Sequence, residues 1–157
     1  VPLQESACKA VFVDTSFVGR QTINLCIKAP EKDAPYCQLS KVMAYHEEQV
    51  IDITPYAHDG LLTWKTPKGT KKNDQWRVIA LYVRYGVMKV KRAAPGGEGL
   101  VIDHFDKQAV NHYLQHIEEA FERTHTPYPH TFFNDSYEVA DATWTPTLLE
   151  EFAKRRG

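Results

Sequence analysis

The first 85 residues carry the short alternating pattern of an antiparallel β-sheet. Polar and apolar positions alternate across Thr22–Ile27, which is the period-two pattern of a strand with one buried face. Prolines and the tripeptide His58-Asp59-Gly60 separate the apolar segments from one another, and these residue types favour turns. The sequence therefore predicts an antiparallel sheet or sandwich, with strands at Ala10–Val13, Thr22–Ile27, Leu39–Tyr45, Val50–Ile53, Gly60–Trp64 and Trp76–Val83.

The pattern changes after Arg84. A glycine-rich stretch, Lys89–Gly99, leads into the apolar run Leu100–Ile102, which predicts a strand. A helix is predicted next, because Asp106 can accept hydrogen bonds from the free amides of a first turn and apolar residues follow at spacings of three and four. Those residues are Val110, Tyr113, Leu114, Ile117 and Phe121, and the helix is expected to end near Arg123.

A second strand and helix are predicted further along. The run His130–Asn134 is typical of a buried strand, and Thr145 with Pro146 is typical of a helix start. Strand, helix, strand, helix is the alternation that builds a parallel sheet or a (β/α) barrel. We therefore expect an α/β fold, in which a β-rich, sandwich-like segment (residues 1–85) precedes the opening βα units of a (β/α) barrel (residues 86–157).

Composition excludes some classes of function. The chain has 157 residues and a formal net charge of -1, so nothing suggests the basic face that nucleic-acid binding requires. No run of 18 apolar residues predicts a membrane span. The sequence opens at Val1 without a Met or a basic leader, and we expect it to be an internal piece of a larger protein. Its three cysteines show no CxxC spacing, so neither a zinc knuckle nor a redox motif is predicted, and Cys26 is expected to be buried.

Carboxylates follow both strands predicted for the second half. In a (β/α) barrel the catalytic residues follow the carboxyl ends of strands, and here those ends present Asp103-His104 and Asn134-Asp135, with Glu138 close behind. Glycoside hydrolysis needs two carboxyl groups, one to protonate the leaving oxygen and one to activate water or attack the sugar. Partial desolvation would raise the pKa of Glu138 and suit it to the acid role. Spacing alone also permits Asp135 to cap a turn and Glu138 to be a solvated loop charge.

Other readings stay open from the residues alone. Glu98, between two glycines, could point into a pocket or lie in a plain turn. His112 and His116 have a metal-binding spacing on the outer face of the predicted helix and, together with His104, would suggest a metal hydrolase. A third possibility is a non-catalytic carbohydrate-binding or structural module in which the β-rich half binds sugar through Trp64, Trp76 and Tyr82.

Several sequence blocks together resemble the alpha-L-rhamnosidases of glycoside hydrolase family 106. The resemblance runs in order from about Gly60 to Gly157 and is looser before that. The blocks that carry it are Lys89–Gly99, Asp103–Phe105, Phe132–Glu138, Trp144–Pro146 and Phe152–Gly157.

The resemblance implies a glycosidase with a (β/α) barrel catalytic domain and appended β-sandwich domains, which removes terminal L-rhamnose from plant or pectic glycans with inversion. It implies that Glu138 is the general acid, and that Asp103, His104, Asn134, Asp135 and Glu98 line the sugar pocket. Family members are similar in using calcium near the sugar hydroxyls, although no ligand set follows from this sequence. The partner carboxylate is expected outside these 157 residues, so the isolated polypeptide is expected to be inactive. The complete protein is expected to be periplasmic or extracellular.

Overall fold

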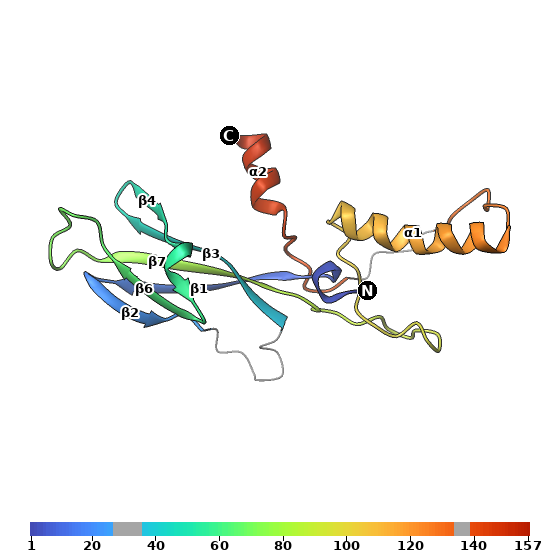
Figure 1. The fold of residues 1–157 in the computed structure, drawn as a ribbon, viewed down its shortest axis with the longest axis horizontal. Helices are drawn as coiled ribbons and strands as arrows, with labels where there is room; N and C mark the ends of the chain where they lie inside the picture. Colours follow the sequence, from blue (N-terminus) through green and yellow to red (C-terminus); the bar gives the residue numbers. More distant parts are fainter. Residues whose placement is uncertain (27–35, 134–138) are drawn as a thin grey trace. The chain divides into compact units, whose positions relative to one another are not determined.

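A computed structural model describes residues 1–26, 36–133 and 139–157 of the chain (Figure 1). These residues form two compact units. One unit is Ala10–Arg84, and the other combines Val1–Lys9 with Tyr85–Gly157. In sequence, the first unit is therefore inserted between the two parts of the second.

The unit Ala10–Arg84 is built from two antiparallel sheets. The four-stranded sheet has the order β1-β7-β3-β4, and the three-stranded sheet has the order β2-β6-β5 (Figure 1). Their bounds are β1 Lys9–Phe17, β2 Arg20–Asn24, β3 Cys37–His46, β4 Gln49–Asp52, β5 Ala57–His58, β6 Leu61–Lys65 and β7 Trp76–Arg84. The antiparallel strands predicted for this part of the chain are present.

Alternation along the strands creates the core of this unit. In β6 the burial pattern alternates strictly, with Leu62 and Trp64 buried and their neighbours exposed, as expected for a strand with one face toward a core. Both sheets contribute to one apolar cluster, in which the rings of Trp64 and Trp76 meet edge to face with centroids 5.3 Å apart. The hydroxyl of Tyr82 donates a 2.8 Å hydrogen bond to the carbonyl of Leu25, which satisfies two buried polar groups.

Two helices lie in the other unit. Helix α1 covers Lys107–Thr124, and Asp106 caps it by accepting a hydrogen bond from the backbone N–H of Gln108. The predicted helix and its cap are confirmed. Helix α2 covers Leu148–Arg156 and begins after Thr147, so it starts later than the predicted cap at Thr145. No helix among the described residues is both long and apolar enough to cross a membrane.

The predicted α/β fold class is wrong. Leu100 and Ile102 form only isolated antiparallel bridges, with Lys89 and Ser6, and residues 130–133 contain no strand. Phe133 is 90% exposed, so the apolar residues of the predicted strand at His130–Asn134 do not form a buried strand in the described part. No βα unit of a barrel occurs in the described residues, because a strand needs a paired neighbour and these segments have none in parallel.

Candidate functional site

Asp103 lies where several segments of the second unit meet. The backbone N–H of Asp103 donates to the carbonyl of Glu5, and that of Ala7 donates to Val101, both at 2.8 Å. Cys8 forms an isolated antiparallel bridge with Trp144. The start of the chain is thus joined on one side to the segment before α1 and on the other to the segment before α2.

The carboxyl group of Asp103 is sealed from solvent by this arrangement. The residue is 1% exposed, and its Oδ1 accepts a 3.0 Å hydrogen bond from the backbone N–H of Phe105. Burial raises the pKa of Asp103, and the bond from Phe105 and the interaction with Thr145 only partly oppose that effect. The group is therefore a buried acid that fixes the turn leading into α1.

The thiol of Cys8 is enclosed beside Asp103. Its sulfur lies 3.1 Å from the carbonyl oxygen of Trp144 and 3.9 Å from Oδ2 of Asp103. Burial, followed by the nearby carboxylate of Asp103, raises the pKa of Cys8 to about 12. Because the thiolate is the nucleophile, this cysteine is inert in the folded chain. Cys26 was predicted to be buried, and this prediction is wrong because Cys26 is exposed.

A cleft of about 380 Å³ borders the buried acid. Phe105 and Thr145 line the cleft, and both also interact with the carboxyl group of Asp103. Glu151 of α2 contributes a carboxylate whose pKa is lowered by the hydrogen bond from Lys154, so it is charged at neutral pH. The lining combines hydroxyls, one ion pair and aromatic surface, and consists of Phe105, Ala142, Thr143, Trp144, Thr145, Thr147, Leu148, Glu151 and Arg155.

The structure brings only some of the predicted site residues together. Asp103 and His104 are adjacent, and the half-buried ring of His104 packs on Phe105 with centroids 4.0 Å apart. Glu98 is exposed, and its carboxylate accepts a 2.9 Å hydrogen bond from the N–H of Gly96, so it stabilises its own turn. Asn134, Asp135 and Glu138 lie outside the described residues. Their proposed roles, like those of Asp103, His104 and Glu98 in sugar binding, stay predictions.

Sequence reasoning missed several residues around Asp103. Cys8 lies 95 positions away in the chain, Glu151 was not singled out, and Arg155 was named only within the block Phe152–Gly157 that resembles the family. No local pattern links these positions. Contacts of such long sequence separation depend on the tertiary fold.

The described residues offer no ready metal cage. No three His, Cys, Asp or Glu side chains among them are grouped so that they could share an ion. His112, a residue of the possible metal hydrolase, lies 2.9 Å from the carboxylate of Glu5. Calcium takes six or more oxygen ligands, and the thiol and the backbone N–H around Asp103 do not supply them. The calcium ion therefore stays a prediction from the resemblance, and we assign no step to it.

The aromatic residues of the non-catalytic interpretation are core residues. Trp64, Trp76 and Tyr82 are 6%, 1% and 7% exposed. A side chain enclosed in the core of a sandwich cannot offer its face to a sugar ring. Any sugar binding by this unit must use other groups.

Comparison with known proteins identifies the class. A family model for the alpha-L-rhamnosidases of glycoside hydrolase family 106 matches residues 17–157, which places the chain among the glycoside hydrolases. The chain belongs to this alpha-L-rhamnosidase family.

One curated relative also carries a glycosidase name. It is a Formosa agariphila protein described as "Putative beta-glucuronidase", and it is 32% identical over 116 residues. The match covers 71% of this chain and 10% of the relative, so the chain spans about a tenth of the length of that protein. No solved structure matches the chain.

Proposed function

We propose that the complete gene product is an inverting alpha-L-rhamnosidase, which removes terminal L-rhamnose from plant or pectic glycans. The observation that carries this proposal is the family match across residues 17–157. That match includes the block Phe132–Glu138 as well as the segment around Asp103. The resemblance of these two blocks to the family was evident from the residues themselves.

In this proposal Glu138 protonates the departing glycosidic oxygen. A second carboxylate then activates a water molecule on the opposite face of the sugar, and inversion requires the two carboxyl groups to be about 6.5–9.5 Å apart. The turn that Asp103 fixes before α1 and the cleft lined by Thr145 would support the sugar pocket. His104, Asn134, Asp135 and Glu98 would line that pocket.

Direct assay separates this proposal from its nearest competitor. The name of the Formosa agariphila relative suggests a beta-glucuronide as the alternative substrate. Purified complete gene product is incubated with p-nitrophenyl α-L-rhamnoside and, in parallel, with p-nitrophenyl β-D-glucuronide. Rhamnoside cleavage with the β-anomer of L-rhamnose as the first NMR-detected product supports the proposal. Cleavage of the glucuronide alone, or first release of the α-anomer, would contradict the substrate or the inverting outcome respectively.

A further inference from the structure

A polar groove lies at one end of the β-sheet unit. Its walls are the tight turn between β3 and β4 and the longer connection between β6 and β7, and its volume is about 420 Å³. Glu47 in the tight turn has a positive φ of 51°, which allows the short connection. The lining residues are His46, Glu47, Gln49, Pro67, Lys68, Gly69, Thr70, Lys71, Asp74 and Trp76.

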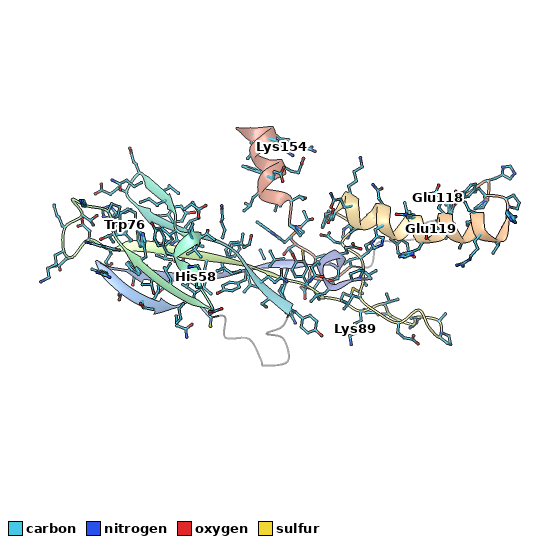
Figure 2. All side chains as sticks on the ribbon, viewed as in Figure 1. His58, Trp76, Lys89, Glu118, Glu119 and Lys154 are labelled. Atoms are coloured by element: carbon cyan, nitrogen blue, oxygen red, sulfur yellow. The ribbon has the colours of Figure 1, made fainter. Side chains whose placement is uncertain are left out.

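The imidazole of His46 lines the groove, and the buried indole of Trp76 supports it from behind. The imidazole of His46 stacks on the indole of Trp76, with centroids 5.0 Å apart and planes 24° from parallel. Trp76 is held in the core of the unit at the start of β7 (Figure 2). Its Nε1 is buried and has no hydrogen-bond acceptor among the described residues.

The polar groups of the groove are held in place before any ligand arrives. Oδ2 of Asp74 accepts a 2.9 Å hydrogen bond from the backbone N–H of Lys71 and lies 4.0 Å from Nε2 of His46. Thr70 is tied to the carbonyl of Pro67 by its hydroxyl at 2.8 Å. A site whose groups are already ordered loses less entropy on binding.

The charges of the groove balance. Glu47 and Asp74 carry negative charge, whereas Lys68 and Lys71 carry positive charge, and the amide of Gln49 both donates and accepts. An anion or a cation would meet repulsion as well as attraction here. A neutral molecule with several hydroxyl groups can use donors and acceptors of both kinds.

A second groove of about 400 Å³ shares Trp76 with the first. It is lined by Asp14, Thr15, Ser16, Gln75, Trp76 and Arg77. Both grooves are lined by polar side chains near Trp76.

We propose that the groove around His46 and Asp74 binds a pyranose unit of a neutral glycan, as a non-catalytic site. The ring of His46, backed by Trp76, contacts the apolar face of the sugar, and Asp74 and Gln49 bind its hydroxyl groups. The choice of a rhamnoside as probe rests on the proposed function. The existence of the groove and its chemistry do not.

Titration followed by ¹⁵N–¹H NMR of the 157-residue chain tests this assignment. The probe is methyl α-L-rhamnoside, and free galacturonate serves as the charged comparison. We expect shifts at residues 46–49 and 67–76 with rhamnoside and weaker ones with galacturonate. Because one lost hydrogen bond costs about a fivefold change in affinity, Gln49→Ala and Asp74→Asn should each weaken binding by about that factor.

Matched variants outside the groove serve as controls. Gln21 is exposed on β2, and Asp59 lies at a positive φ of 48°, a backbone conformation that asparagine tolerates. Gln21→Ala and Asp59→Asn should leave the affinity unchanged, and thermal unfolding of all four variants confirms that each folds.

Three results would overturn the assignment: no shifts at the solubility limit of the probe, shifts confined to other residues, or preference for galacturonate. If the groove does not bind the rhamnoside but the complete gene product hydrolyses rhamnosides, only the proposal for the groove is rejected. If the groove binds the rhamnoside but the complete gene product does not hydrolyse rhamnosides, only the proposed catalytic function is rejected.

Discussion

The sulfur of Cys8 lies 3.9 Å from Oδ2 of Asp103, and both groups are buried. This pair joins the beginning of the chain to the turn before α1, while the same sulfur reaches the carbonyl of Trp144. The carboxylate of Asp103 makes ionisation of the Cys8 thiol less favourable, because a thiolate would face a like charge in a desolvated setting. The pair is therefore a buried contact between a thiol and a carboxyl group within its unit.

The first prediction concerns the reactivity of Cys8. A thiol with a pKa of about 12 is ionised in only about one molecule in ten thousand at pH 8. Iodoacetamide at pH 8 should therefore modify the exposed Cys26 within minutes and leave Cys8 unmodified until urea unfolds the chain. Peptide mass mapping measures both sites in one sample. Equal labelling rates for Cys8 and Cys26 in native buffer would contradict the buried position.

The second prediction follows from the raised pKa of Asp103. A carboxyl group whose pKa is higher in the folded state binds more protons there than in the unfolded state, so its contribution to stability falls as the pH rises. The amide side chain of the Asp103→Asn variant cannot titrate but can still accept the hydrogen bond from Phe105. The free energy of unfolding of wild type relative to Asp103→Asn should therefore decrease from pH 3.5 to pH 7. Urea unfolding at several pH values measures this difference.

Asp52 provides a control with the opposite sign. Hydrogen bonds from Lys41 and Thr54 lower the pKa of Asp52 to about 2, so its stabilising effect is present above the ordinary aspartate pKa and is lost as the pH falls toward 2. Relative to Asp52→Asn, wild type should gain stability as the pH rises through that window. The same trend for both aspartates would show that the burial of Asp103 does not govern its titration.

The third prediction concerns the turn at Gly60. Gly60 has a φ of 76°, and a Cβ added there would overlap the sulfur of Cys26. Gly19 has a similar φ of 64° with nothing within 4 Å of an added Cβ. Gly19→Ala should cost about 1 kcal/mol of backbone strain, and Gly60→Ala should cost more because of the overlap. Urea unfolding gives both values.

A double variant isolates the overlap. Removing the sulfur with Cys26→Ala should bring the additional cost of Gly60→Ala down to that of Gly19→Ala. An unchanged cost in the Cys26→Ala background would mean that the sulfur does not contact Gly60. The comparison uses the change caused by each glycine substitution, so the direct effect of Cys26→Ala cancels.

Local sequence signals predicted the elements that depend on local physics. The cap at Asp106 and the spacing of apolar residues located α1, because a helix satisfies its own backbone. Period-two alternation across Thr22–Ile27 predicted a strand where β2 covers Arg20–Asn24, and Ile23 of that strand packs against the core. Neither signal required knowledge of a distant partner.

The errors fall where a partner decides the outcome. Leu100–Ile102 and residues 130–133 have apolar runs like those of strands, yet the first makes only isolated bridges and the second leaves Phe132 and Phe133 exposed. An apolar run shows that a segment can be buried, whereas strand formation also requires a neighbour in register. The cluster of Cys8 with Asp103 was missed for the same reason.

The substitution Glu138→Gln in the complete gene product tests the central claim most directly. If Glu138 is the general acid, this variant should still bind the glycan but hydrolyse it on the order of 100-fold more slowly, because general acid catalysis contributes at least that factor. Its loss on p-nitrophenyl α-L-rhamnoside, whose leaving group needs less protonation, should be smaller. A wild-type rate of rhamnose release from the natural glycan would contradict the account.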